Sequence, residues 1–99
     1  MQTFKERGVS VVAFIEHWTY NGERYGWRYS GTFAHDVSHN ADPYAATQKL
    51  LSMWKTSEDR YKLRDRDPFG VETKENINTM SAGQFYSLVR RSNELDTGR

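Results

Sequence analysis

The chain lacks several residue classes, and each absence narrows what it can do. None of its 99 residues is cysteine, which excludes disulfide bonds, thiolate metal sites and cysteine nucleophiles. The 14 basic and 13 acidic side chains give a net charge of +1, so global charge attracts neither nucleic acid nor a membrane strongly. No stretch approaches the roughly 20 apolar residues of a membrane span, and the charged start lacks a secretory apolar segment. We therefore expect a cytoplasmic protein without a membrane partner.

Hydrophobic residues are scarce, whereas aromatic residues are abundant. Hydrophobic side chains make up 36% of the chain and aromatic side chains 14%. Each large ring buries roughly 150–250 Å², so the composition predicts a core built mainly from rings. At this length we expect a single domain over residues 1–99, with loose ends at residues 1–8 and 95–99.

A β-hairpin turned at Asn21-Gly22 is the strongest local signal. Asn and Gly both tolerate the positive φ that a two-residue type I′ turn requires at its central positions. Strand-forming residues precede and follow this pair. Such a turn pairs Tyr20 with Glu23 and Trp18 with Tyr25, because the turn sets the register of the hairpin.

This register predicts which face of the hairpin is buried. The predicted core face carries Val12, Phe14, Trp18, Tyr25, Trp27, Tyr29 and Phe33. The predicted reverse face carries Val11, Ala13, Ile15, His17, Thr19, Arg24, Arg28, Ser30 and Thr32. We expect helices to cover the aromatic face, with the arginine-bearing reverse face left exposed.

Two amphipathic helices are predicted after the hairpin. Asp42 is a good N-cap and Pro43 suits a first helical position. The apolar arc of this helix contains Ala46, Thr47, Leu50, Leu51, Met53 and Trp54. The second helix begins after Ser81, which has capping-box spacing to Gln84.

The remaining segments predict further strands. Residues 61–64 alternate apolar and basic side chains, and residues 71–73 form a short fourth strand. Residues 74–79 are polar and are predicted to form a loop. The expected fold is α+β, with an antiparallel sheet of three to four strands in the order β-β-α-β-(β)-α and two amphipathic helices packed on one face.

Two groups of residues raise the question of catalysis or metal binding. His35 and His39 have the spacing of zinc ligands on a helix, but they precede the helix start and are expected in a polar loop. The residue types of a small ribonuclease occur at Glu16, His17, Arg28 and His35. Glu16 is predicted on the face opposite His17 and Arg28. We therefore predict no enzyme, no metal site and no cofactor.

Basic residues favour nucleic acid as one class of partner. A basic strip would form if the third strand joined the hairpin, from Arg24, Arg28, Arg60, Lys62, Arg64 and Arg66. The run Ser30-Gly31-Thr32-Phe33, followed by a helix with Ala45-Ala46, is similar to the small DNA-binding domains of phage-type integrases and plant ethylene-response factors. That likeness implies DNA binding through a three-stranded sheet.

Surplus aromatic residues favour a protein partner instead. Exposed Tyr and Trp beside Arg are typical of protein-binding surfaces. In class, the chain resembles short, cysteine-free phage and mobile-element proteins that block a host machine, anti-CRISPR proteins included. We predict a small non-enzymatic inhibitor acting through protein–protein contacts, as a monomer or homodimer, with a nucleic-acid-binding module as the alternative. The candidate contact residues are Arg24, Arg28, His17, Tyr20, Tyr44, Arg64 and Arg66.

Overall fold

The computed structural model describes residues 3–54 and 58–97, with side chains as far as Ser92. The elements are β1 (Ser10–Tyr20), the single-turn helix α1 (Gly22–Tyr25), β2 (Trp27–Asp36), α2 (Pro43–Trp54), β3 (Asp59–Leu63), β4 (Phe69–Glu72), β5 (Ile77–Met80) and α3 (Ala82–Thr97). The predicted α+β class is confirmed, with a five-stranded antiparallel sheet. The strand that was not predicted is β5, which lies largely in the segment predicted to be a loop. The sequence did not indicate it, because its side chains show no alternating apolar pattern and most of them are exposed.

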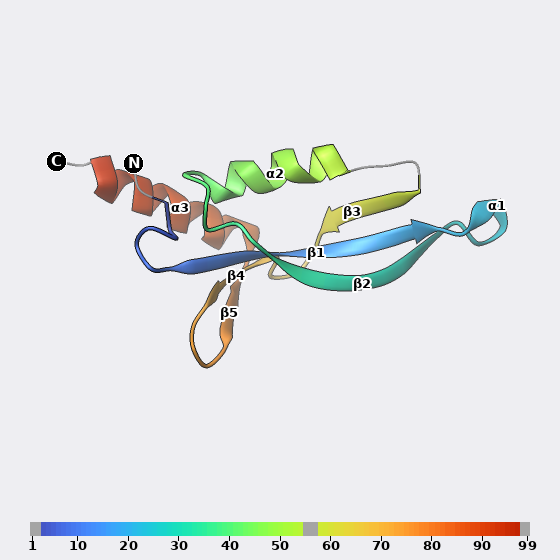
Figure 1. The fold of residues 1–99 in the computed structure, drawn as a ribbon, viewed down its shortest axis with the longest axis horizontal. Helices are drawn as coiled ribbons and strands as arrows, with labels where there is room; N and C mark the ends of the chain where they lie inside the picture. The colour runs from blue at the N-terminus through green and yellow to red at the C-terminus, as the bar shows by residue number, and fades with distance from the viewer. Residues whose placement is uncertain (1–2, 55–57, 98–99) are drawn as a thin grey trace.

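Strand β1 is the centre of the sheet (Figure 1). Strand β2 pairs along one side of β1. On the other side, β4 pairs with the first half of β1 and β3 with the second half, while β5 pairs with β4. Between these halves, the Phe14 N–H donates to the Pro68 carbonyl at 2.7 Å and the Phe14 carbonyl accepts from the Arg64 N–H at 2.9 Å. One long strand therefore joins both ends of a molecule that measures 58 × 28 × 21 Å.

The predicted hairpin register is wrong. Tyr20 pairs with Trp27, because the connection runs from Asn21 to Gly26 and contains α1. Asn21 has a φ of −113°, whereas Gly22 and Gly26 take the positive φ values of 85° and 65°. The Asn21 N–H donates to the Gly26 carbonyl at 2.8 Å and closes this longer loop. A second glycine four residues after the first thus displaces the two-residue turn.

The observed pairing is shifted by four residues, an even number, so Phe14, Trp18, Trp27 and Tyr29 share one face as predicted. Val12 of this row is buried as predicted, but the helices cover the other face. Val11, Ala13 and Ile15 were predicted on the exposed face, but they are fully buried. Most of the aromatic row lies on the side away from the helices, and a β-bulge between His17 and Trp18 separates Phe33 from the rest of this row. Phe33 follows the bulge and lies on the helix side, at 6.3 Å from the Trp54 ring.

The core lies between the helices and the aliphatic face of β1. It contains Phe4, Val11, Ala13, Ile15, Val37, Phe69, Phe85 and Val89. The Phe69 and Phe85 rings stack at 4.1 Å with an interplanar angle of 6°. Three of these eight core residues are aromatic, so the core is mixed rather than mainly aromatic.

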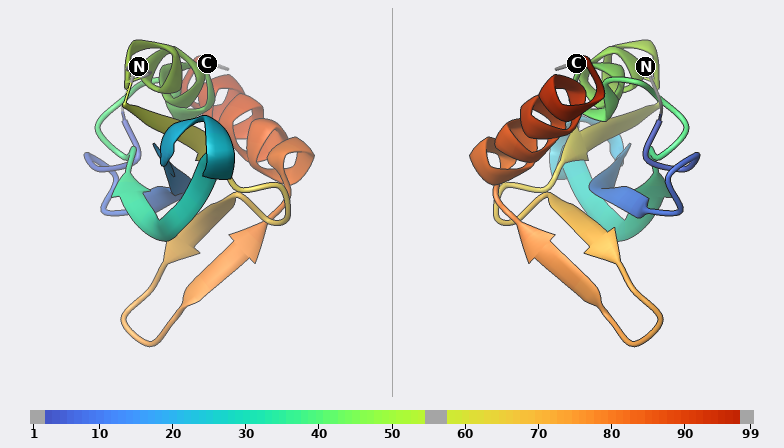
Figure 2. Two further views of the ribbon diagram at one scale, coloured as in Figure 1. Left: turned by 90° about the vertical axis from the view of Figure 1, so that its right-hand side faces the viewer. Right: turned by 90° about the vertical axis from the view of Figure 1, so that its left-hand side faces the viewer.

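Both predicted helix starts are confirmed. The Asp42 carboxylate accepts a hydrogen bond from the Ala45 N–H at 3.1 Å. Ser81 and Gln84 exchange hydrogen bonds of 2.8 and 3.2 Å, which is a capping box. The two helices pack on the same side of the sheet (Figure 2).

The two ends predicted to be loose are more ordered than expected. Phe4 is buried, and the Lys5 N–H donates to the Ser38 carbonyl at 3.0 Å. Helix α3 extends to Thr97. Residues 1–2 and 98–99 of the predicted loose ends lie outside the described residues. Within the described ranges, no helix is both long and apolar enough to cross a membrane.

Candidate functional site

One face of the sheet, formed by β1, β2 and β3, is left uncovered by the helices in the described part of the chain. Helices α2 and α3 lie on the opposite side, as the end-on views in Figure 2 show. The strand pairing places on this open side Phe14, Trp18, Tyr20, Trp27, Tyr29, Arg60, Lys62 and, just beyond β3, Arg64. We call these residues the aromatic–arginine face.

The rings of this face contact one another across the strands. Trp18 meets Tyr29 edge to face at 5.5 Å, and Tyr20 lies against Trp27 at 5.3 Å. Cross-strand aromatic pairs of this kind contribute roughly 0.2–1 kcal/mol each to sheet stability. Tyr20 and Tyr29 remain 44% and 49% exposed. The rings are therefore held in position while a large part of their surface stays in contact with solvent.

Two arginine side chains lie over rings of the same face. The guanidinium carbon of Arg60 is 4.3 Å from the Trp27 ring centre, and that of Arg64 is 4.1 Å from the Phe14 ring centre. Arg64 also donates to the carbonyls of Arg66 at 2.9 Å and Asp67 at 2.6 Å. These contacts restrict the conformations of both long side chains.

The charge of the face is mainly positive. Glu16 contributes a carboxylate, which accepts a hydrogen bond from the Trp18 indole at 3.1 Å and lies opposite Lys62 in the strand register. Lys62 also lies 3.5 Å from Asp65, an exposed pair of the kind that contributes about 0–1 kcal/mol. With Arg60 and Arg64 beside them, these groups give a surface with more hydrogen-bond donors than acceptors.

A groove of about 500 Å³ lies on the helix side of the sheet. It is lined by His17, Phe33, Met53, Trp54 and Tyr61. The His17 ring stacks on Tyr61 at 4.9 Å, and its buried Nε2 lies 3.6 Å from a carboxylate oxygen of Asp59 without a hydrogen-bond partner. Trp54 meets Tyr61 edge to face at 5.4 Å. The groove therefore borders a set of rings that pack α2 onto the sheet.

The residues considered for catalysis do not come together. Glu16 points to the aromatic–arginine face, whereas His17, Arg28 and His35 lie on the opposite side of the hairpin, as predicted for His17 and Arg28. His35 meets the Trp54 ring at 5.1 Å. His39 is exposed in the connection before α2. Across the residues that the structure describes, no three His, Asp or Glu side chains are grouped to hold a metal ion.

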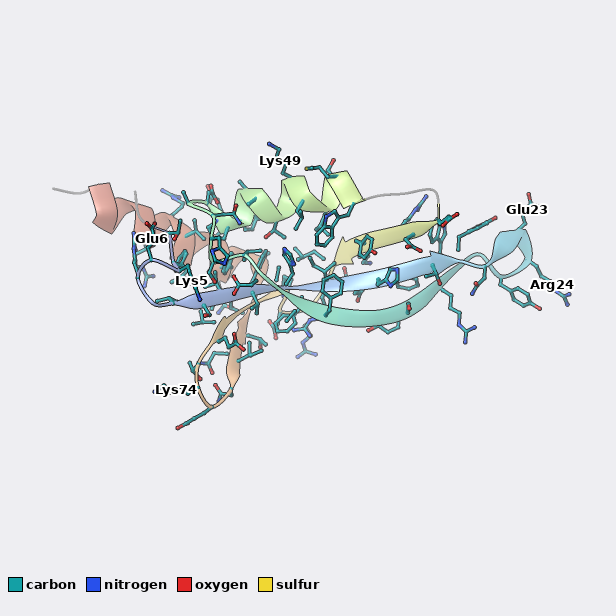
Figure 3. All side chains as sticks on the ribbon, viewed as in Figure 1. Lys5, Glu6, Glu23, Arg24, Lys49 and Lys74 are labelled. Atoms are coloured by element: carbon teal, nitrogen blue, oxygen red, sulfur yellow. The ribbon has the colours of Figure 1, made fainter. Side chains whose placement is uncertain are left out.

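The candidate contact residues separate into two sets. Tyr20 and Arg64 belong to the aromatic–arginine face, and the Arg66 carbonyl supports Arg64. Arg24 and Arg28 are exposed at the far end of the hairpin, where Glu23 and Arg24 project away from the body of the molecule (Figure 3). Arg28 pairs with Thr19 and so lies on the same side of the hairpin as His17, as predicted, which separates it from Arg60 and Lys62 of the predicted basic strip.

The other two candidates, His17 and Tyr44, lie on the helix side. Tyr44 is half-buried, with its ring 5.8 Å from Phe69 and 5.2 Å from Tyr86. It links α2 to α3, just as His17 supports Tyr61 beneath α2. Both residues are thus positioned by packing inside the fold.

Sequence reasoning missed much of the aromatic–arginine face. Trp18, Trp27 and Tyr29 were assigned to the core because the helices were expected to cover the aromatic face of the hairpin. A signal against that assignment was present at Glu16, a carboxylate in the same alternating row as Trp18. The other row of β1, which contains Val11, Ala13 and Ile15, has no charged residue and is the better candidate for burial.

The chain was compared with known protein families, curated proteins and solved structures. No protein-family model, no curated protein and no solved structure matches this chain. A function must therefore be argued from the geometry of the aromatic–arginine face.

Proposed function

We propose that this chain is a small non-enzymatic binding protein that holds a protein partner on its aromatic–arginine face. The observation that carries the proposal is an uncovered sheet face on which arginine guanidinium groups lie over aromatic rings, at Arg60–Trp27 and Arg64–Phe14. Trp, Tyr and Arg are the residue types most enriched among binding hot spots.

The side chains of the aromatic–arginine face are held in place by contacts within the chain, which supports a role in binding. Binding costs free energy when flexible side chains must be immobilised, roughly 0.5–1.5 kcal/mol for each rotamer-rich side chain. Here Tyr29 and Trp18 are already in contact, and Arg64 is already held by two backbone carbonyls. A partner that covers the face gains ring burial while the ordering cost is reduced.

Single-stranded nucleic acid is the second candidate partner. Arg60, Lys62 and Arg64 lie beside the rings, and such platforms combine cations with aromatic side chains on which bases stack. Base stacking needs open ring faces, however, and guanidinium groups already lie over the rings of Trp27 and Phe14. The net charge of +1 also provides little long-range attraction. Both observations favour a protein partner.

The identity of the partner stays a prediction. We keep the expectation that it belongs to a host machine blocked by a phage or mobile-element inhibitor of the anti-CRISPR class.

A capture experiment with matched variants tests the proposal. Tyr29 and Tyr86 are exposed to nearly the same extent, at 49% and 47%, but Tyr86 lies on α3. Immobilised wild type, Tyr29→Ala and Tyr86→Ala are incubated with lysate of the source cells, and captured proteins are quantified. We expect one protein to be retained by the wild type and Tyr86→Ala and depleted with Tyr29→Ala.

Two results would contradict the proposal. One is equal capture by all three baits, which would place the binding site elsewhere. The other is retention of nucleic acid alone, lost after nuclease treatment and falling steeply with salt, which would support the second candidate.

A further inference from the structure

Strand β2 forms one edge of the sheet. Within residues 3–54 and 58–97 it pairs with β1 and with no other strand. A strand at an edge presents one row of backbone N–H and C=O groups that its own sheet does not use. The question is which residues of β2 supply that row.

Hydrogen bonds on β1 identify the free row. The Phe14 backbone bonds to Pro68 and Arg64 on the side away from β2, so Ala34, its partner on β2, belongs to a pair without hydrogen bonds to β1. At the other end of the pairing, the Val37 N–H donates to the Val11 carbonyl at 3.0 Å. The backbone groups of β2 therefore alternate between bonding to β1 and pointing outward in the same phase at both ends. The N–H and C=O groups of Thr32, Ala34 and Asp36 therefore point outward from the edge.

The two long edges of the sheet differ in their protection. Edge strands usually avoid pairing with another chain through charged residues, proline or bulges. The β3 edge carries Arg60 and Lys62, with Arg64 next in the same alternation. After its bulge, the regular part of β2, residues 31–36, has no proline and no Lys or Arg, and its carboxylate stands at the last position.

We propose that a second copy of this chain pairs antiparallel with β2, about a two-fold axis through Ala34. The outward groups of Thr32, Ala34 and Asp36 are symmetric about Ala34, so that this axis gives each one a hydrogen-bond partner in the other copy. Thr32 then lies opposite Asp36 of the second copy, a hydroxyl facing a carboxylate. The side chain at the axis is a single methyl group, which permits close approach.

The pairing makes one continuous sheet from two chains. Thr32, Ala34 and Asp36 lie on the same side of β2 as the aromatic–arginine face, since they pair with Glu16, Phe14 and Val12. The two aromatic–arginine faces thus become neighbours on one surface. The dimer does not depend on what that surface binds.

Proline substitution at the axis tests the proposal. Proline removes an N–H, and at Ala34 that N–H points outward, so the β1–β2 ladder is kept. Thr79→Pro is the matched control, because Thr79 pairs with Gly70 on β5, which forms a third, separate edge of the sheet. Sedimentation equilibrium over a concentration series measures association, and circular dichroism with thermal unfolding checks the fold.

We expect the wild type and Thr79→Pro to reach twice the monomer mass of 11.6 kDa. In Ala34→Pro the dimer dissociation constant should rise about tenfold or more, because two symmetry-related hydrogen bonds are lost. Ala34→Glu is a second variant that keeps the N–H but brings two carboxylates together at the axis, and we expect it to weaken the dimer as well. A monomeric wild type, or a dimer unaffected by both Ala34 variants, would overturn the proposal, and so would association only with a strand of another protein.

Discussion

The guanidinium carbon of Arg60 lies 4.3 Å from the centre of the Trp27 ring, although the two residues come from strands on opposite sides of β1. The arginine side chain therefore crosses the central strand on the open side of the sheet. A cation–π contact at such an exposed site contributes about 0.5–1 kcal/mol. This contact stabilises the fold little, but it fixes the shape of the surface offered to a partner.

Replacing Arg60 should separate binding from stability. We expect Arg60→Ala to lower the free energy of unfolding by about 1 kcal/mol or less, because only an exposed contact is lost. The same variant should lose most of its captured partner. Urea denaturation measures the first effect and quantitative capture the second. A loss of several kcal/mol together with retained binding would show that Arg60 has a structural role instead.

Replacing an aromatic residue of the core should lower the stability of the fold far more than replacing a residue of the aromatic–arginine face. Phe69 and Phe85 are fully buried and stack at 4.1 Å. We expect Phe85→Ala to lower the free energy of unfolding by about 3–5 kcal/mol, through lost burial and the cavity left behind. Urea denaturation of Phe85→Ala and of Trp27→Ala checks this prediction. We expect Trp27→Ala, on the aromatic–arginine face, to lose clearly less free energy of unfolding. Equal losses would mean that the aromatic–arginine face is buried.

A buried hydroxyl secures the start of β1. Ser38 Oγ accepts from the Val11 N–H at 2.7 Å and donates to the Val11 carbonyl at 3.2 Å. Ser38→Ala leaves this buried N–H without its acceptor, and we expect a loss of about 1–3 kcal/mol. Ser87→Ala, at an exposed position of α3, is the control and should change stability little. Similar unfolding midpoints for both variants would contradict the assignment.

The carboxylate of Asp36 should make stability depend on acid pH. Burial acts to raise the pKa of Asp36, but hydrogen bonds from Ser38 and the charges of His39 and Lys5 bring it below its ordinary value of 3.8. A carboxyl whose pKa is lower in the folded state stabilises the fold above its ordinary pKa. That contribution is lost as the pH falls through the lowered value.

Unfolding measured against pH checks this sign. Wild type should be more stable than Asp36→Asn near neutral pH, and the difference should shrink as the pH falls below about 3.8. A difference that grows in acid would show that the pKa of Asp36 is raised in the folded state.

Local signals in the sequence predicted the helices correctly. Asp42 and Ser81 each act within one turn of their own helix, so their capping hydrogen bonds need no distant partner. The class of fold followed from such local patterns. The prediction of the hairpin turn was wrong because Asn21-Gly22 was treated as sufficient for a two-residue turn, whereas Gly26 completes a longer loop.

The open face was missed because the row that carries Phe14, Trp18, Trp27 and Tyr29 was assigned to the core, although those residues do share one face as predicted. A register change by an odd number of residues moves a strand's side chains to the other face, but the change from Glu23 to Trp27 opposite Tyr20 is four residues and keeps the faces. The bulge after His17 alone moves Phe33 to the helix side, and the sequence carries no local signal for that bulge. The cations of β3 were recognised as a basic strip, but their position beside Trp27 depends on β3 pairing with β1 over Ile15–Thr19.

The three tryptophans provide the most direct test of the binding face. Trp18 and Trp27 belong to the aromatic–arginine face, whereas Trp54 packs on the helix side against Tyr61 and His35. In protein with ¹⁵N-labelled tryptophan, each indole N–H gives its own NMR signal, which can be followed as the captured partner is added. We predict that the signals of Trp18 and Trp27 shift or broaden while that of Trp54 keeps its position. A shift confined to Trp54, with Trp18 and Trp27 unchanged, would contradict the assignment of this face as the binding site.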